Sequence, residues 1–148
     1  MKIILQKVKR AHVEVAGEIV GEIADGFVLL LGIAHGDTEA DAEKLVNKIL
    51  KLRLFSDPGS DTFMERNIVE ENGGILVISQ FTLYGDCSKG TRPSFTAAAR
   101  PEEAKPLYAY VLNALREKSG LRVEAGEFGE HMEVMLVNDG PITLVLEG

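Results

Sequence analysis

The chain is short of the residues that mark several broad classes of protein. It has one cysteine and no tryptophan among 148 residues. A lone Cys87 can form neither an internal disulfide nor a multi-cysteine metal framework, which favours a reducing, cytoplasmic setting. The longest apolar run, residues 27–31, is far too short to cross a bilayer, and the charged N-terminus is unlike a secretory signal. Membrane, fibrous and disulfide-scaffold classes are therefore excluded.

The usual signatures of catalysis are missing as well. The sequence has no dinucleotide fingerprint, no P-loop and no Gly-x-Ser-x-Gly elbow. Its three histidines, His12, His35 and His131, have no metal-ligand spacing, so we expect neither a metal site nor a cofactor. Cys87 has no neighbouring histidine to activate it and is expected to be an inert, partly exposed thiol.

Positive charge is scarce overall. Lys and Arg total 16 against 23 Asp and Glu, which gives a net charge of −7. A long phosphate-binding footprint needs a concentrated positive face and is not expected, although binding of one end of a nucleic acid stays open. Four basic residues lie in the second half of the chain, between positions 89 and 105: Lys89, Arg92, Arg100 and Lys105. They would guide a nucleic acid if the fold gathers them, or form an ordinary solvated face if it does not.

Size and patterning predict one β-rich α+β domain over residues 1–148. With 45% hydrophobic residues and no repeat or linker, the chain is long enough to bury one core. Strand patterns cover residues 12–15, 19–23, 27–34, 75–83, 121–125, 131–137 and 142–146, and residues 57–74 read as a loop with at most a short irregular strand. We expect about eight strands in a barrel-like or mixed sheet, because the strands do not alternate with helices as in a Rossmann sheet.

Two helices complete the prediction. Residues 38–52 repeat apolar side chains at helical spacing after a capping Asp37 or Thr38. A second helix follows Arg100 and ends at Gly120. Because proline inside a helix removes a hydrogen bond, its regular part is expected to begin near Pro106.

Two segments break their local pattern. Ser79, Gln80 and Thr82 bring polar groups into an otherwise apolar strand, where alternation would put Ser79 and Phe81 on one face. Such a cluster is either a strand end passing to solvent or a set of groups offered to a ligand.

The second such segment is residues 137–143, with Gly140-Pro141 inside an apparent strand. Proline cannot donate a ladder hydrogen bond, so it marks an edge, a bulge or a tight turn. The sequence leaves open whether the Gly140–Pro141 bond is cis.

Together these segments resemble the D-aminoacyl-tRNA deacylase family nearly end to end. The resemblance rests on Gln6-Lys7-Val8, the Phe55-Ser56-Asp57 turn, Ser79-Gln80-Phe81-Thr82-Leu83, residues 90–95 and Asn138-Asp139-Gly140-Pro141-Ile142-Thr143. It implies a homodimer that hydrolyses the ester between a D-amino acid and the terminal adenosine of tRNA, and also cleaves glycyl-tRNA such as alanine tRNA mischarged with glycine. It implies no DNA or membrane partner.

The resemblance also implies roles for particular residues. Ser79, Gln80, Phe81 and Thr82 would line the catalytic half of the site, with the Phe81 N–H as oxyanion donor. Gly140 and Pro141, joined by a cis bond, would enter the partner subunit's pocket, bind the substrate and reject L-amino acids. No side chain is implied as the nucleophile, because the 2′-hydroxyl of the terminal ribose is thought to assist the attacking water.

Some features depart from the family pattern or leave alternatives. Lys7 stands where arginine is usual, and a lysine offers a point charge in place of a planar fork. Residues 58–67 form a longer segment than the common version, so no role is carried over to them. A non-catalytic RNA- or nucleotide-binding module, or an esterase with Thr82 or Ser79 as covalent nucleophile, are the alternatives; a threonine nucleophile would need a nearby base.

Overall fold

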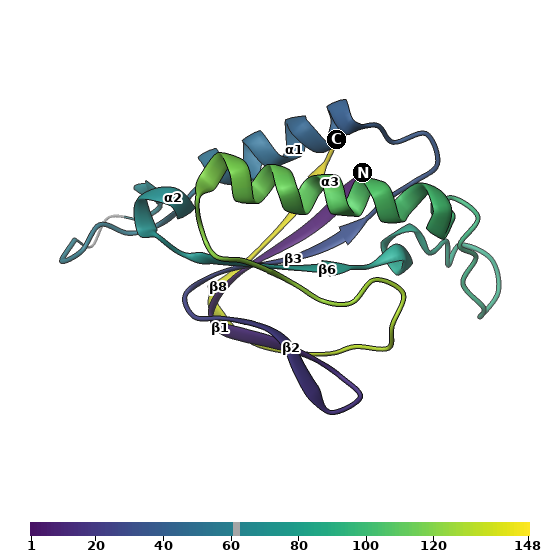
Figure 1. The fold of residues 1–148 in the computed structure, drawn as a ribbon, viewed down its shortest axis with the longest axis horizontal. Helices are drawn as coiled ribbons and strands as arrows, with labels where there is room; N and C mark the ends of the chain where they lie inside the picture. Colours follow the sequence, from purple (N-terminus) through teal and green to yellow (C-terminus); the bar gives the residue numbers. More distant parts are fainter. Residues whose placement is uncertain (61–62) are drawn as a thin grey trace.

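The computed structural model describes residues 1–60 and 63–148, in which eight strands, three α-helices and one 3-10 turn form an α+β fold (Figure 1). The elements in chain order are β1 (Lys2–Val15), β2 (Glu18–Ile23), β3 (Gly26–Gly32), α1 (Glu39–Lys51), β4 (Arg53–Phe55), β5 (Arg66–Asn67), α2 (Ile68–Glu71), β6 (Gly74–Ser79), the 3-10 turn η1 (Phe81–Tyr84), α3 (Pro101–Ser119), β7 (Val123–Ala125) and β8 (Glu133–Glu147). The fold class and the number of strands agree with the sequence prediction.

Strand β1 is the centre of a curved, mixed, barrel-like sheet. Its first half pairs antiparallel with β3, its second half pairs with β2, and β8 runs antiparallel along nearly its whole length. Strands β6 and β7 continue the sheet in parallel beyond β3, while β4 and β5 form a separate ribbon. Strand β8 pairs only with β1 in the described residues, so its other edge is open.

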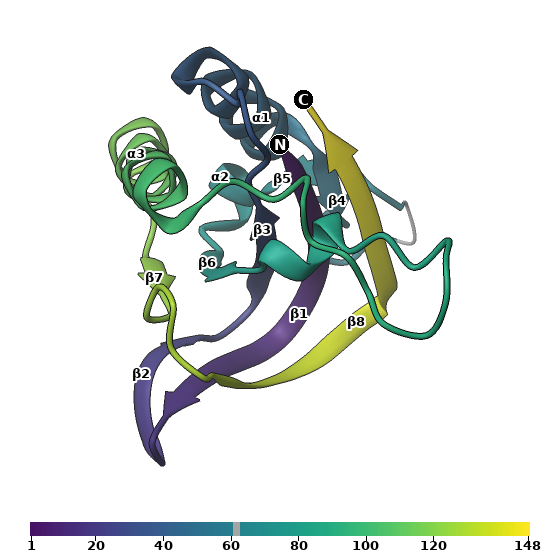
Figure 2. The same cartoon turned by 90° about the vertical axis from the view of Figure 1, so that its right-hand side faces the viewer.

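Helices α1 and α3 lie side by side over one face of this sheet (Figure 2). The larger core lies between these helices and the sheet, and a second apolar cluster lies on the sheet's opposite face. Strands β3 and β6 are consequently buried on both sides: Leu29 belongs to the first cluster and Val28 to the second. This confirms that the apolar run beginning at Phe27 is a doubly buried strand, although the strand ends at Gly32 and not at the predicted Ala34.

Helix α1 forms where its capping signal and apolar spacing predict it. The Thr38 hydroxyl accepts a hydrogen bond from the Asp41 N–H, and the Asp41 carboxylate accepts one from the Thr38 N–H. This reciprocal pair satisfies two backbone donors that the first turn leaves open. The buried side of the helix consists of Ala42, Leu45, Val46, Ile49 and Leu50.

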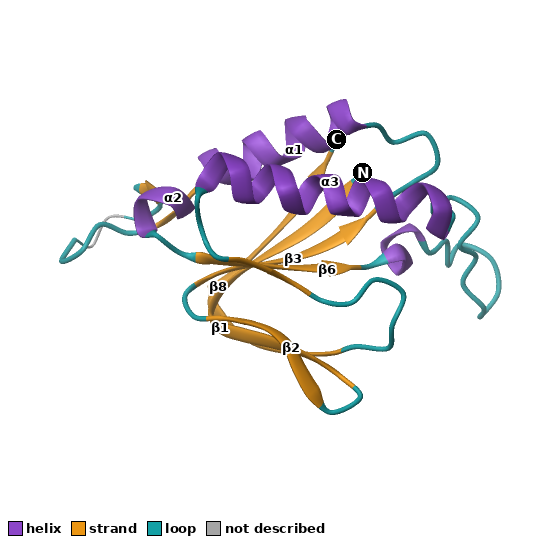
Figure 3. Cartoon of the chain, viewed as in Figure 1, coloured by secondary structure: helices purple, strands orange, loops and turns teal. Residues whose placement is uncertain are grey.

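Several predicted boundaries were wrong. Helix α3 begins at Pro101, because proline has a suitable backbone conformation for the first turn of a helix. It continues through an exposed Pro106, because burial of the helix's apolar side outweighs the backbone hydrogen bond that Pro106 cannot donate. The predicted strand 75–83 ends at Ser79, and the 3-10 turn begins two residues later at Phe81 (Figure 3). The segment 57–74 contains the short helix α2, which Asn67 caps, so three α-helices replace the predicted two.

The two ends of the chain also differ from prediction. The first strand begins at Lys2, ten residues before the pattern that suggested it. The two predicted strands 131–137 and 142–146 are one strand, β8, which continues past Gly140-Pro141 by means of a bulge. No helix in the described part of the chain is long and apolar enough to cross a membrane.

Candidate functional site

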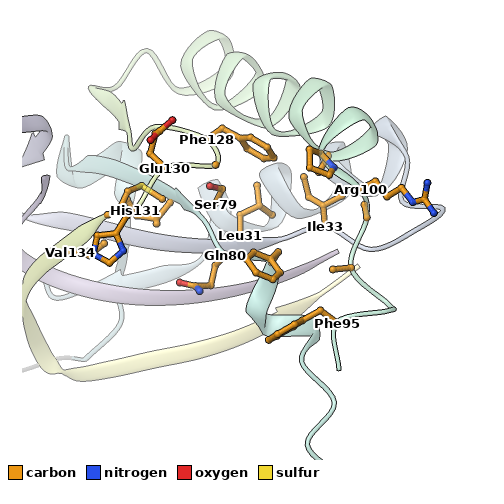
Figure 4. A pocket seen from close by; sticks show the side chains of 18 residues that line it. Leu31, Ile33, Ser79, Gln80, Phe95, Arg100, Phe128, Glu130, His131 and Val134 are labelled. Atoms are coloured by element: carbon orange, nitrogen blue, oxygen red, sulfur yellow. The ribbon is translucent and has the colours of Figure 1, made fainter. Parts of the chain in front are cut away.

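A pocket of about 580 Å³ opens where β6 meets η1 and the start of α3 (Figure 4). Apolar side chains from four separate parts of the chain make its walls, and the side chains of Leu31, Ile33 and Phe128 are seen around its interior. Polar and charged residues also line it, among them Ser79, Gln80, Arg100, Glu130 and His131. Apolar walls with few polar groups are typical of a small-ligand site.

The polar end of β6 forms one side of the pocket. The Gln80 N–H donates to the Leu31 carbonyl at 2.8 Å, which is the last ladder bond before the chain turns into η1. The N–H groups of Phe81 and Thr82 then have no acceptor within the described residues, because they begin a short 3-10 turn. This places two free backbone donors beside the pocket.

Aromatic rings extend the pocket wall outward. The Phe81 ring, 57% exposed, packs edge-to-face against Phe95 with ring centroids 5.1 Å apart. An added Cβ at Gly85 would lie 2.9 Å from the Phe95 ring, so glycine allows this close approach. Two partly exposed aromatic rings beside a pocket form an apolar platform suited to a flat group.

Thr82 differs from its three neighbours. Ser79, Gln80 and Phe81 line the pocket, whereas Thr82 does not, and its hydroxyl accepts a hydrogen bond from the Gln80 side chain. Within the described residues no histidine or carboxylate is hydrogen-bonded to the hydroxyl of Thr82 or Ser79. No three His, Cys, Asp or Glu residues of the described chain gather as metal ligands.

Gly140 and Pro141 lie on a bulge of β8, away from the walls of this pocket. Opposite them, Gln6 pairs with Thr143 and Val8 pairs with Asn138, so four residues of β8 face one residue of β1. Gly140 has a φ of +124°, and an added Cβ would lie 2.7 Å from the Ile142 side chain, so only glycine fits there without strain. The Gly140–Pro141 bond is cis.

Side chains of the same motif hold this bulge. The Asn138 side-chain oxygen Oδ1 accepts the Ile142 N–H at 3.1 Å, and the Asn138 side-chain Nδ2–H donates to the Thr143 hydroxyl at 3.0 Å. The Gln6 amide also donates to that hydroxyl, at 3.3 Å. The Asn and Thr of the sequence motif thus replace the ladder bonds that the bulge removes.

An ion pair braces the bulge against β1. The Lys7 ammonium lies 2.8 Å from the Asp139 carboxylate and 5.0 Å from the centre of the Phe55 ring. Its hydrogen bond and charge hold the pKa of Asp139 below its ordinary value. The same carboxylate and Asp25 raise the pKa of Lys9 above its ordinary value. Lys7 therefore contacts this loop through the side chain of Asp139, the residue that precedes Gly140.

The described chain brings only part of the predicted site together. Ser79, Gln80 and Phe81 share one pocket, while Gly140 and Pro141 are exposed on another element. Sequence reasoning missed the pocket's other walls, because Phe95 on one side and Phe128 and Met132 on the other come from two segments far from Ser79 in the sequence. Cys87 is an exposed free thiol, and residues 61–62 of the longer segment 58–67 lie outside the described residues.

Comparison with known proteins gives consistent matches along the chain. The family model described as D-Tyr-tRNA(Tyr) deacylase matches residues 4–147. A D-aminoacyl-tRNA deacylase of Halalkalibacterium halodurans is 55% identical over 147 residues, covering 99% of both chains. One from Thermus aquaticus is 52% identical and covers 99% of this chain and 95% of the relative.

Solved structures show the same fold. A structure titled c-Myc DNA Unwinding Element Binding Protein has a TM-score of 0.93 and 39% identity, and covers 100% of this chain and 99% of the other. A probable eukaryotic D-amino acid tRNA deacylase has a TM-score of 0.85 at 17% identity over 99% of this chain and 98% of the other. At that identity the second likeness concerns the fold alone.

Proposed function

The chain belongs to the D-Tyr-tRNA(Tyr) deacylase family and hydrolyses D-aminoacyl-tRNA, and we propose on that premise that its pocket binds the aminoacylated terminal adenosine. The observation that most supports this assignment is the free N–H pair at Phe81 and Thr82 beside an apolar pocket of about 580 Å³. The products are a free D-amino acid and tRNA, and the enzyme acts in the cytoplasm as a single domain over residues 1–148.

The chemistry is attack of water on the ester carbonyl, assisted by the 2′-hydroxyl of the terminal ribose. The carbonyl oxygen becomes negatively charged, and the Phe81 N–H donates a hydrogen bond to it. Loss of one such donor costs about 2.7–4 kcal/mol of transition-state stabilisation in other hydrolases. The ester bond then breaks, and the 3′-oxygen of the ribose takes a proton as it leaves. Ser79 and Gln80 position the ester and ribose.

Selection for the D-amino acid depends on a second subunit. Gly140 and Pro141 are exposed on the open-edged strand β8 and are absent from the walls of their own pocket. A homodimer would insert this loop into the partner's pocket, where backbone carbonyls bind the α-amino side and leave no room for an L side chain. Glycine has no side chain to reject, so glycyl-tRNA, including alanine tRNA mischarged with glycine, is also cleaved.

The alternatives have less support. An esterase with Thr82 as nucleophile needs a base, and the Thr82 hydroxyl has only the Gln80 amide as a partner in the described chain. Ser79 lacks a partner base in the same way. A non-catalytic RNA- or nucleotide-binding module would have no use for the bulge that Asn138 and Thr143 hold in shape.

Release of tyrosine from D-tyrosyl-tRNA and L-tyrosyl-tRNA tests the selection. We expect fast release from the D substrate and release close to the uncatalysed rate from the L substrate, because only the L side chain meets the Gly140-Pro141 carbonyls. Radiolabelled amino acid released per unit time measures both. Equal rates for the two substrates would contradict the proposed gate.

A tRNA that ends in 2′-deoxyadenosine tests the mechanism. We expect its D-tyrosyl ester to be cleaved at least about a hundredfold more slowly, the typical range of lost general acid–base assistance. The substrate's KM should change little, which separates chemistry from binding. Cleavage at the normal rate would show that the 2′-hydroxyl takes no part.

A further inference from the structure

A positively charged loop adjoins the pocket on one side. Residues 87–101 carry Lys89, Arg92 and Arg100 and no acidic residue, although the whole chain has a net charge of −7. The segment joins η1 to α3, and residues 86–97 are exposed without interruption. It projects from the body of the fold beyond the 3-10 turn (Figures 1 and 2).

The cations of this loop have no protein partner. Other basic residues, such as Lys7, Lys9 and Lys118, form ion pairs with carboxylates. Across the described ranges 1–60 and 63–148, by contrast, Lys89, Arg92 and Arg100 make no ion pair or side-chain hydrogen bond. Asp86 and the glutamates of the first turn of α3 flank the loop, but no carboxylate of the described residues pairs with its three cations. Unpaired cations on one exposed loop raise the local electrostatic potential of an otherwise acidic protein.

The loop's closure places these cations near the pocket. The Asp86 N–H donates to the Ser94 carbonyl at 2.7 Å, and the Ser94 N–H donates back to the Asp86 carbonyl at 2.9 Å. Phe95, the next residue, lines the pocket, as does Arg100. At about 3.6 Å per residue, Lys89 lies at most about 11 Å from this closure and Arg92 about 7 Å from it. Since a stacked strand advances about 3.4 Å per nucleotide, that distance covers the first few phosphates outside the pocket.

We propose that Lys89, Arg92 and Arg100 form a phosphate-binding track for the single-stranded 3′ end of tRNA as it enters the pocket. This inference rests on the proposed function, because it assumes that the terminal adenosine occupies the pocket. Arginine binds phosphate oxygens with its planar fork, and lysine binds them as a point charge. Three such contacts, in place of a long basic face, reconcile tRNA binding with the net charge of −7.

The variant K89Q/R92Q tests the track while leaving the pocket lining unchanged. Two substrates are compared: D-tyrosyl-tRNA, and D-tyrosyl-adenosine, which has no phosphate. We expect KM for D-tyrosyl-tRNA to rise about tenfold or more with kcat unchanged, and the kinetics on D-tyrosyl-adenosine to stay the same. The slope of log(1/KM) against log salt should become shallower by about 1.4, since each single-strand phosphate contributes about 0.7.

The matched control is K44Q/K48Q, which removes two exposed lysines from α1. The control should keep the wild-type KM and slope; an equal effect in both variants would overturn the track in favour of overall charge. An unchanged KM for K89Q/R92Q would overturn it directly. Lost activity on D-tyrosyl-adenosine with weaker self-association in sedimentation would assign the loop to a subunit contact instead. Wild-type inactivity on both substrates would contradict the proposed function itself.

Discussion

At the scale of single residues, the Thr82 hydroxyl accepts a hydrogen bond from the Gln80 side chain and does not line the pocket. A hydroxyl in that position is suited to holding the local structure and not to nucleophilic attack, because no base in the described chain is hydrogen-bonded to it to remove its proton. The backbone N–H of the same turn is what we expect to act on the substrate. The two roles make opposite predictions for removal of the side chain.

We therefore expect Thr82→Ala to keep kcat/KM for D-tyrosyl-tRNA within about fivefold of wild type, whereas loss of a true nucleophile costs about a millionfold in a protease. Deacylation kinetics measure the difference, and circular dichroism checks the fold. Phe81→Pro is the informative companion, because it removes one N–H donor and should lower kcat by about 100- to 1000-fold. A correctly folded but inactive Thr82→Ala would return Thr82 to the role of nucleophile.

At the scale of secondary structure, one buried hydrogen bond ties α3 to the sheet beneath it. The Tyr108 hydroxyl donates to the Val77 carbonyl of β6 at 2.8 Å, in surroundings that leave Tyr108 only 4% exposed. That carbonyl also accepts the Gly126 N–H, so it keeps one partner if the hydroxyl is removed. Burial raises the pKa of Tyr108 to about 12. Helix α3, whose first residues line the pocket, is thus held against the sheet partly by the Tyr108 hydroxyl, which loses its proton only at high pH.

For this reason we expect Tyr108→Phe to lower the free energy of unfolding by about 1 kcal/mol at pH 7, the usual worth of one hydrogen bond. The folded pKa lies above the ordinary value of 10.0, so the stability linked to Tyr108 is fully present below pH 10 and is lost as pH rises toward 12. Urea unfolding of both proteins between pH 7 and 12 measures this. The gap between them should narrow above pH 10, and a constant gap would show that Tyr108 does not titrate differently in the two states.

The sequence predicts well those elements that are formed by interactions between residues close together in the chain. It predicts poorly those that depend on contacts between distant segments. Helix α1 has its cap and apolar spacing within fifteen residues, so its ends were predicted closely. The continuity of β8 across Gly140-Pro141 depends on pairing with β1, more than 120 residues away in the sequence, and local turn chemistry suggested two strands. The start of α3 at Pro101 likewise reflects burial against the sheet, which outweighs the cost of Pro106.

The candidate site divides in the same way. Ser79, Gln80 and Phe81 stood out because polar groups interrupt an apolar strand, and Gly140 and Pro141 because proline interrupts another. Phe128 and Arg100 gave no comparable local signal, since an aromatic or basic residue in a loop is ordinary. Their place at the pocket arises only when distant segments fold together.

At the scale of the whole molecule, one chain has both halves of the proposed site but holds them apart. The pocket lies between β6, η1 and α3, while Gly140 and Pro141 stand exposed on β8, which has one open edge and exposed apolar side chains at Met135, Val137 and Val145. An open edge bearing apolar side chains is a surface suited to pairing with another chain. A symmetric dimer would complete two identical sites, each with a pocket from one subunit and a loop from the other.

Mixing two defective chains tests this sharing of sites. Phe81→Pro disables the pocket by removing its N–H donor, and Gly140→Ala distorts the loop, because the new Cβ would lie 2.7 Å from Ile142. Each variant alone should be nearly inactive. In a mixed dimer, one site has both defects and the other has none. When equal amounts of the two variants are refolded together and half of the dimers are mixed, about a quarter of all sites are intact. We therefore expect about a quarter of the wild-type activity. If each chain carried its own complete site, every site would keep one defect and mixing would restore nothing, so recovery of activity distinguishes a site shared between subunits from one within a single chain.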